Sequence, residues 1–244
     1  MSKKSHSSNR GMNVGLFCLH IFSFSLMVVI MQNASQLETI NDELAFYELY
    51  HSNPWNQAIH FIFVPTIVWT LSIWFVHAEL LPISISLPFT PRHRINHGTI
   101  WLFLAAYFYL SIDPLAGTLY LPCMYFFFYG SAVWLRKKDQ HLCKSKSWSG
   151  TGNLLKWSAF LHVASWALQI FGHVYFESGR PALLDSLGQA LTIAPLFAFY
   201  EGLWALGINK ELQQLTLTNV ANLTKSFCQP GSPMYVCQNI VSET

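Results

Sequence analysis

The sequence has few charged residues. Asp, Glu, Lys and Arg make up 11% of the 244 residues, whereas hydrophobic residues make up 52% and aromatic residues 16%. A soluble domain usually has about 25% charged residues, because it needs them to cover its surface. The charge deficit therefore favours a protein that has lipid as part of its solvent. The net charge of +2 is too small for a nucleic-acid-binding surface, and no basic run with interleaved aromatics indicates one.

Several catalytic and binding motifs are also missing. The sequence has no Walker phosphate-binding loop, no G-x-S-x-G nucleophile elbow, no H-E-x-x-H zinc motif and no dinucleotide-binding fingerprint. Its five cysteines show no C-x-x-C spacing, and their odd number and scattered placement fit neither a disulfide framework nor a zinc site. Cys228 and Cys237 are one possible pair across a Pro-Gly turn, and five free thiols are the simpler interpretation.

The sequence does have long uncharged apolar runs, and about 20 such residues span a bilayer as a helix. They cover residues 15–31, 57–77, 99–135, 154–176 and 188–208. Asp113-Pro114 interrupts the third run, and the residue before a proline is pushed out of the helical region. Residues 99–135 therefore predict a hairpin of two short helices. We predict an all-α, polytopic transmembrane bundle of five or six helices.

Three parts are expected along the chain. Residues 1–40 form an N-terminal extension, and their apolar run at 15–31 is a signal peptide or a signal anchor. No A-x-A-like cleavage site follows the run, which favours the anchor. Residues 41–210 form a membrane-embedded domain, and residues 211–244 form a polar, loose tail.

Charge distribution indicates an orientation. If all six helices span, one side collects 13 of the 14 Lys and Arg residues, and Arg180 alone falls on the other. The positive-inside rule makes the basic side cytosolic. His51 and the loop at 177–185 are then expected together on the opposite, lumenal side. On the basic side, His93 and His97 stand beside Arg92 and Arg94, which favours a headgroup-facing role over metal binding.

One polar segment begins the second apolar run. Asn53 followed by Pro54 predicts a helix start, with Asn as the N-cap and Pro at the first position. His51 then lies just outside the helix, and Asn56 and His60 lie one turn apart on one face. A lone histidine in an apolar helix is commonly a structural hydrogen-bonder, yet an ionisable residue at membrane depth is also a functional candidate.

A second polar segment lies on the helix predicted at 154–176. His162, Trp166, Gln169, His173 and Glu177 fall on one stripe of about 80°, given 100° per residue. Such a stripe faces protein or a water-filled cavity, because unpaired polar groups in hydrocarbon are costly. His173 and Glu177 at i, i+4 can share one metal, and Gln169 is expected to hydrogen-bond His173. A structural polar seam is the alternative, and a structural role is expected for His162.

The following residues extend the candidate site. Asp185 either serves the next helix start through the macrodipole or adds a carboxylate near His173. Glu201 lies in the middle of the last apolar run and is expected to pair with a polar group of another helix. Histidines and a carboxylate with open positions are the ligand set of non-haem Fe(II) oxygenases, and zinc accepts the same ligands. The candidate ligands are His51, His60, His173, Glu177 and Asp185.

These segments also carry a family resemblance. The motifs are Tyr50-His51-x-Asn53-Pro54-x-Asn56-x-x-Ile59-His60, then Val64-Pro65, and Gln169-x-x-Gly172-His173-x-x-Phe176-Glu177-x-x-x-Pro181-Ala182-Leu183-x-Asp185. They resemble the fungal 2-hydroxy fatty acid dioxygenase family, from about Leu44 to about Gly207. Ser186 stands where the family usually has Asn, and residues 1 to about 40 have no counterpart.

The resemblance implies a function. Members cleave a 2-hydroxy fatty acid with O₂ and Fe(II), giving CO₂ and a fatty acid one carbon shorter. This is the α-oxidation step of phytosphingosine breakdown, at the endoplasmic reticulum membrane. The resemblance implies that His51, His60 and His173 are functional, whereas iron binding by Glu177 is inferred from helical spacing. We assign Arg180, Asn56 and Trp166 to substrate binding, Arg180 as the partner of the substrate carboxylate.

A rival function uses the same residues without catalysis. A membrane scaffold or small transporter would use the histidines and Glu201 as a structural or proton relay. Transporters often show internal symmetry, and this sequence shows none.

Overall fold

The computed structural model describes residues 40–144, 152–177 and 192–227, and most of these residues are helical. The helices are α2 (Ile40–Glu48), α3 (Pro54–His77), α4 (His97–Ile112), α5 (Pro114–Pro122), the π-helix η1 (Cys123–Gly130), α6 (Ser131–Lys144), α7 (Gly152–Phe176), α9 (Ala194–Ala205) and α10 (Lys210–Phe227). The run at 15–31 and the Cys228–Cys237 pair lie outside the described residues.

Helix α3 is central to the fold. The side chain of Asn53 accepts a hydrogen bond from the Trp55 amide at 2.9 Å, and Pro54 occupies the first helical position. Because proline has no amide hydrogen to lose and its φ suits a helix start, the sequence predicts this boundary, and the prediction is confirmed. The 24 residues of α3 extend over about 36 Å.

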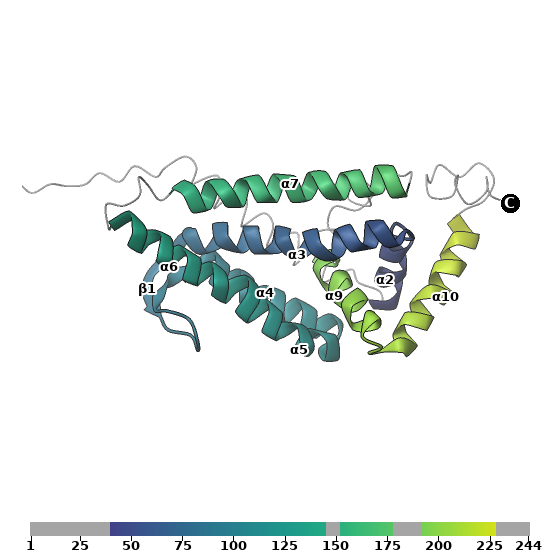
Figure 1. The fold of residues 1–244 in the computed structure, drawn as a ribbon. Coiled ribbons are helices and arrows are strands. Elements are labelled where there is room, and N and C mark those ends of the chain that lie inside the picture. The colour runs from purple at the N-terminus through teal and green to yellow at the C-terminus, as the bar shows by residue number, and fades with distance from the viewer. Residues whose placement is uncertain (1–39, 145–151, 178–191, 228–244) are drawn as a thin grey trace, which may run out of the picture.

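Helix α7 lies along α3, as Figure 1 shows. The two helices approach closely at Gly172, where an added Cβ would lie 2.5 Å from Asn56 Oδ1. Polar bonds join them elsewhere: Trp74 Nε1 donates to Ser158 Oγ at 2.8 Å, and Thr70 Oγ1 lies 2.7 Å from His162 Nδ1. The polar stripe predicted on α7 therefore faces α3.

The hairpin predicted at 99–135 is present. Helix α4 ends at Ile112, and Asp113 Oδ1 accepts hydrogen bonds from the amides of Leu115 and Ala116 at the start of α5. The second arm continues through η1 into α6, so it extends beyond the predicted end at residue 135. The charged side chains after Leu135 ended the apolar pattern, but they did not end the helix.

Residues 79–98, which separate two of the predicted apolar runs, contain two strands, so the described chain is mostly helical and not all-α. Strands β1 (Glu79–Ile85) and β2 (His93–Asn96) pair antiparallel, with Ile85 opposite His93. The short strands and their irregular register leave no clear alternation of polar and apolar residues, and Pro82 lies inside β1. The apolar pattern therefore gave no signal for them.

The tail was expected to be loose after Asn209, and this is wrong for residues 210–227. They form α10, which packs against α2 (Figure 1). Thr216 Oγ1 donates to Asn41 Oδ1 at 3.2 Å, and Asn219 Nδ2 donates to Asp42 Oδ1 at 3.1 Å. A polar composition did not prevent helix formation, because these polar side chains bond a neighbouring helix.

Two helical segments are long and apolar enough to cross a membrane: Pro54–His77 and Pro114–His141. Helix α4 is apolar but shorter, and α9 has only 12 residues. A span of about 30 Å needs roughly 20 residues. The described residues thus indicate two candidate spans, and the bundle of five or six spans and its orientation stay predictions.

Candidate metal site

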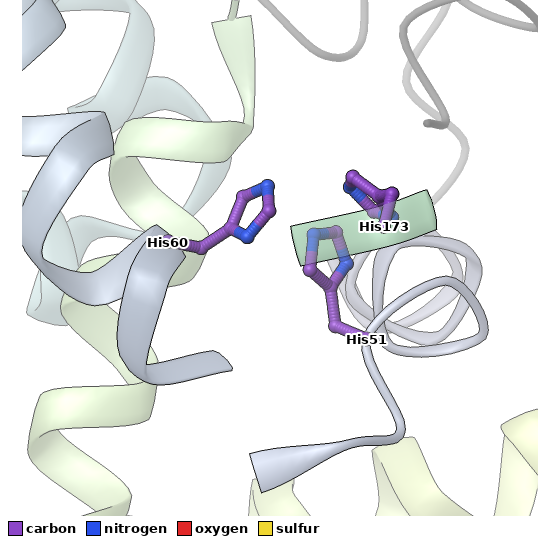
Figure 2. Close-up of side chains that lie close together, drawn as sticks. All are labelled: His51, His60 and His173. Atoms are coloured by element: carbon purple, nitrogen blue, oxygen red, sulfur yellow. The ribbon is translucent and has the colours of Figure 1, made fainter. Parts of the chain in front are cut away.

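Three histidine side chains converge near the start of α3 (Figure 2). His51 precedes α3, His60 lies on α3 and His173 lies on α7. Each offers one nitrogen, and these nitrogens lie within 4.8 Å of one another. The ring centroids are 4.4 to 4.8 Å apart, and each side chain is at most 3% exposed. The structure thus brings together three of the five predicted ligands.

His51 is held by the helix before it. Its Nδ1 lies 2.7 Å from the Tyr47 carbonyl oxygen, and its ring stacks on the Tyr47 ring at 4.5 Å and 2°. Because a carbonyl oxygen only accepts, the proton is on Nδ1 and the lone pair is on Nε2. That Nε2 is buried and has no hydrogen-bond partner within the described ranges. Such an arrangement orients an imidazole for metal binding.

His60 and His173 complete the cluster. His60 Nδ1 donates to the Asn56 carbonyl oxygen at 3.0 Å, which leaves its Nε2 lone pair available. His173 Nδ1 is buried, and none of the described residues forms a hydrogen bond with it. A buried nitrogen without a partner is costly unless something binds it. Two such nitrogens beside a third imidazole fit a transition-metal ion.

The protonation state of His51 also suits a metal ligand. Burial lowers the pKa of His51 well below its ordinary value, and the neighbouring His60 and His173 lower it further. The imidazole is therefore neutral at physiological pH, and a neutral imidazole is the form that binds metals.

Glu177 bonds groups around the histidines. Its Oε1 accepts from the Asn53 amide at 2.8 Å and from Asn56 Nδ2 at 3.0 Å, and its Oε2 accepts from Ser52 Oγ at 2.7 Å. Ser52 and Asn53 directly follow His51, and the carbonyl oxygen of Asn56 accepts the hydrogen bond that orients His60. Glu177 therefore lies close to the segment that carries His51, as predicted, whereas the rest of the loop at 177–185 lies outside the described residues.

The remaining predicted residues are placed as follows. Trp166 Nε1 donates to His162 Nε2 at 3.1 Å, and His162 also contacts Thr70, as expected for a structural histidine. Gln169 Nε2 and His173 Nδ1 each lack a hydrogen-bond partner, so the structure does not place the predicted bond between them. Arg180 and Asp185 lie outside the described residues.

Two other expectations are wrong. Both carboxylate oxygens of Glu201 are buried, and neither has a hydrogen-bond partner in the described part of the chain. His97 is only 6% exposed, so it does not face headgroups, and His93 is 4% exposed and lines a small cavity with Arg92 and Arg94. Instead, His93 Nε2 lies 2.5 Å from Tyr129 Oη.

Sequence reasoning missed Tyr47 and Glu48. Tyr47 orients His51 from four residues away, and the i, i+4 spacing of two aromatic rings was the available signal. Burial, followed by the charge of Glu177, raises the pKa of Glu48 to about 7. Glu48 Oε1 accepts a 3.4 Å hydrogen bond from Gln57, which also donates to the His51 carbonyl oxygen at 2.7 Å.

The fold and the imidazole cluster define a mostly helical protein with a buried three-histidine cluster that could hold a metal ion. Residues 37–204 match the family described as 2-hydroxy-palmitic acid dioxygenase Mpo1-like. The chain is also 33% identical over 174 residues to the 2-hydroxy-palmitic acid dioxygenase MPO1 of Saccharomyces cerevisiae, covering 71% of this chain and 85% of the yeast protein. The chain therefore belongs to the Mpo1-like dioxygenase family, which confirms the resemblance. No solved structure matches it.

Proposed function

We propose that this protein is an Fe(II)-dependent dioxygenase that converts 2-hydroxy fatty acids to fatty acids one carbon shorter. The observation that carries the proposal is the cluster of His51, His60 and His173, with two buried nitrogens that have no hydrogen-bond partner. The family and the yeast relative's printed substrate, 2-hydroxy-palmitic acid, support the reaction class.

The overall reaction is balanced without a further reductant. A 2-hydroxy acid and O₂ give the shortened acid, CO₂ and water, and the bond between C1 and C2 breaks. Bound Fe(II) supplies one-electron chemistry with O₂ and open positions for the substrate. Among the chain's own residues, Tyr47 orients His51 and Asn56 orients His60 through their carbonyl oxygens.

Several residues have proposed roles beyond the three histidines. Arg180 is our proposed partner for the substrate carboxylate, and Trp166 and Asn56 are proposed to line the substrate site. Asp185 stays a candidate ligand. For Glu177, the three hydrogen bonds to the segment at 52–56 favour a positioning role over iron binding.

The proposed location is the endoplasmic reticulum membrane, with the chain crossing it several times. A 2-hydroxy fatty acid partitions into a bilayer, so a membrane-embedded site receives its substrate from the lipid phase. The two candidate spans support membrane association, and the family resemblance supports the organelle.

The deciding experiment is the variant His173→Ala in the full-length protein. We expect it to lose stoichiometric iron and all turnover of 2-hydroxypalmitic acid, while it stays in the membrane fraction. The matched control is His162→Ala on the same helix, which removes a histidine that bonds Thr70 and Trp166 but not the cluster.

Iron content separates this proposal from its rival. A scaffold or transporter would be purified without stoichiometric metal and would form no shortened acid from a 2-hydroxy fatty acid. Retained turnover in His173→Ala would refute the assignment of the site.

A further inference from the structure

A basic cavity lies at the opposite end of α3 from the histidines, between the β-hairpin and α6. Its volume is about 300 Å³, and its cationic lining residues are Arg92, Arg94, Arg136 and Lys137. Val76, which bonds Arg136, is 16 residues beyond His60, about 24 Å along the helix. The cavity is therefore separate from the candidate metal site.

The charge in this cavity is only partly neutralised. Arg136 is 8% exposed and donates to the Val76 carbonyl oxygen and to Glu79 Oε1, each at 2.6 Å. Arg94 donates to Glu79 Oε2 at 3.1 Å, so two guanidinium groups already occupy the Glu79 carboxylate. Arg136 Nε is buried and has no hydrogen-bond partner among the residues that the structure describes. Within the described ranges, Arg92 and Lys137 are exposed and form no ion pair.

An aromatic groove lies along the preceding turn of α6. It has a volume of about 510 Å³, and Trp69, Phe89, Phe126 and Trp134 line it. Trp134 and Lys137 are three residues apart on α6, so they are neighbours on one helix face. The apolar groove and the cationic cavity therefore lie next to each other along α6.

Phe89 is held in the groove at a conformational cost. Its φ is 58°, in the left-handed region that side chains other than glycine rarely adopt, and it is 80% exposed. Trp134 Nε1 donates to its carbonyl oxygen at 3.2 Å, and its ring lies 5.7 Å from that of Phe126. Strain that presents an exposed aromatic ring is typical of a binding surface.

We propose that this surface binds an anionic phospholipid. The phosphate enters the basic cavity, where Arg92 and Lys137 supply uncompensated charge, and an acyl chain lies along the aromatic groove. The cavity is at the end of a candidate membrane span, which places it at the depth of lipid phosphates. Arginine, lysine and tryptophan at that depth are typical of headgroup contacts.

The test is lipid binding to the full-length protein in detergent, measured by native mass spectrometry. The probes are phosphatidic acid and phosphatidylcholine with the same acyl chains. We expect phosphatidic acid to bind about tenfold more tightly, and the double variant Arg92→Gln, Lys137→Gln to abolish that preference. The control, Lys138→Gln with Lys156→Gln, changes the net charge equally at exposed positions outside the cavity and should keep it.

A third variant tests the groove. Phe89→Gly removes the ring and suits the positive φ, so the fold is retained. We expect it to weaken phosphatidic acid binding several-fold while glycerol phosphate binding is unchanged.

Three results would overturn the proposal. They are equal binding of the two lipids, an equal loss in the control double variant, and full displacement of the lipid by glycerol phosphate at similar concentration. The last would show a site for a free phosphate anion and no role for the acyl chain.

Discussion

At the scale of single residues, Glu177 connects the three segments that carry the histidines. Its carboxylate accepts three hydrogen bonds from residues 52–56, and its own amide donates to the His173 carbonyl oxygen at 3.2 Å. A positioning residue and a metal ligand respond differently to substitution. Glu177→Gln keeps the shape of the side chain, but its NH₂ group then faces hydrogen-bond donors of residues 52–56 and cannot accept from them.

We expect Glu177→Gln to lower metal affinity about 10- to 100-fold without removing a ligand. Losing bonds to a charged acceptor should also cost roughly 2 kcal/mol of folding stability. Metal titration and denaturant unfolding measure the two effects. The control is Glu211→Gln, which changes an exposed side chain of α10. A change in ligand number, seen in the absorption spectrum of the Co²⁺-substituted protein, would contradict the positioning role.

Glu48 makes a prediction about pH. Its folded pKa is about 7, above an ordinary value of 4.5, because burial and Glu177 disfavour its charged form. Between these two values the folded state holds a proton that the unfolded state has lost. Below pH 4.5, titration of Glu48 therefore leaves the free energy of unfolding unchanged. As the pH rises from 4.5 to 7, it lowers the free energy of unfolding increasingly.

Replacing Glu48 with Gln removes that cost. We expect Glu48→Gln to stabilise the protein at pH 8 by an amount of the order of 2 kcal/mol, and to have little effect at pH 4.5. Melting temperatures at both pH values test this. An equal change at the two values would rule out titration of Glu48 as the cause.

At the scale of elements, the approach of α7 to α3 places His173 beside His60. Gly172 permits that approach, because a Cβ there would lie 2.5 Å from Asn56 Oδ1 and 3.3 Å from Ile59 Cδ1. Asn56 also bonds Glu177, and its carbonyl group orients His60. A methyl group at 172 would therefore disturb both.

We expect Gly172→Ala to reduce metal occupancy and turnover by at least tenfold. The control is Gly202→Ala on α9, whose added Cβ would meet only the edge of the Phe61 ring at 3.2 Å. Metal content and activity of the two variants are compared after purification in the same detergent. Full occupancy in Gly172→Ala would show that the helices separate without disturbing the site.

Some boundaries and contacts of the helices and strands could be predicted from the sequence, and others could not. The start of α3 at Pro54 and the break at Asp113 were predictable, because capping and proline act within a few residues. Helical period predicted that His173 shares one polar face with Gln169 and His162, but it did not predict that this face meets α3. The donors that bond Glu177 were not predictable, since they lie more than a hundred residues away. Nor were β1 and β2, whose pairing depends on register and not on apolar pattern.

At the scale of the whole molecule, α10 supports the helix that holds His51. It contacts α2 through Thr216 and Asn219, and Val220 packs against Leu49 and Tyr50. Helix α2 in turn presents Tyr47 to His51. The polar tail is therefore connected to the metal site through one intermediate helix.

We expect a chain that ends at Asn209 to bind metal at least tenfold more weakly than the full chain, because α2 loses its cover. A chain that ends at Phe227 keeps α10 and is the matched control. Metal titration of both truncated proteins tests this. Equal affinity would show that α2 holds its position without α10.

The order of the ligands along the chain has a consequence for biogenesis. His51 and His60 leave the ribosome with α3, long before α7 brings His173 and Glu177. A nascent chain that has not yet produced α7 offers only two imidazoles, without the carboxylate that fixes their segment. If the cluster binds iron as proposed, a chain interrupted before α7 therefore lacks one of the three imidazoles and cannot form the complete site.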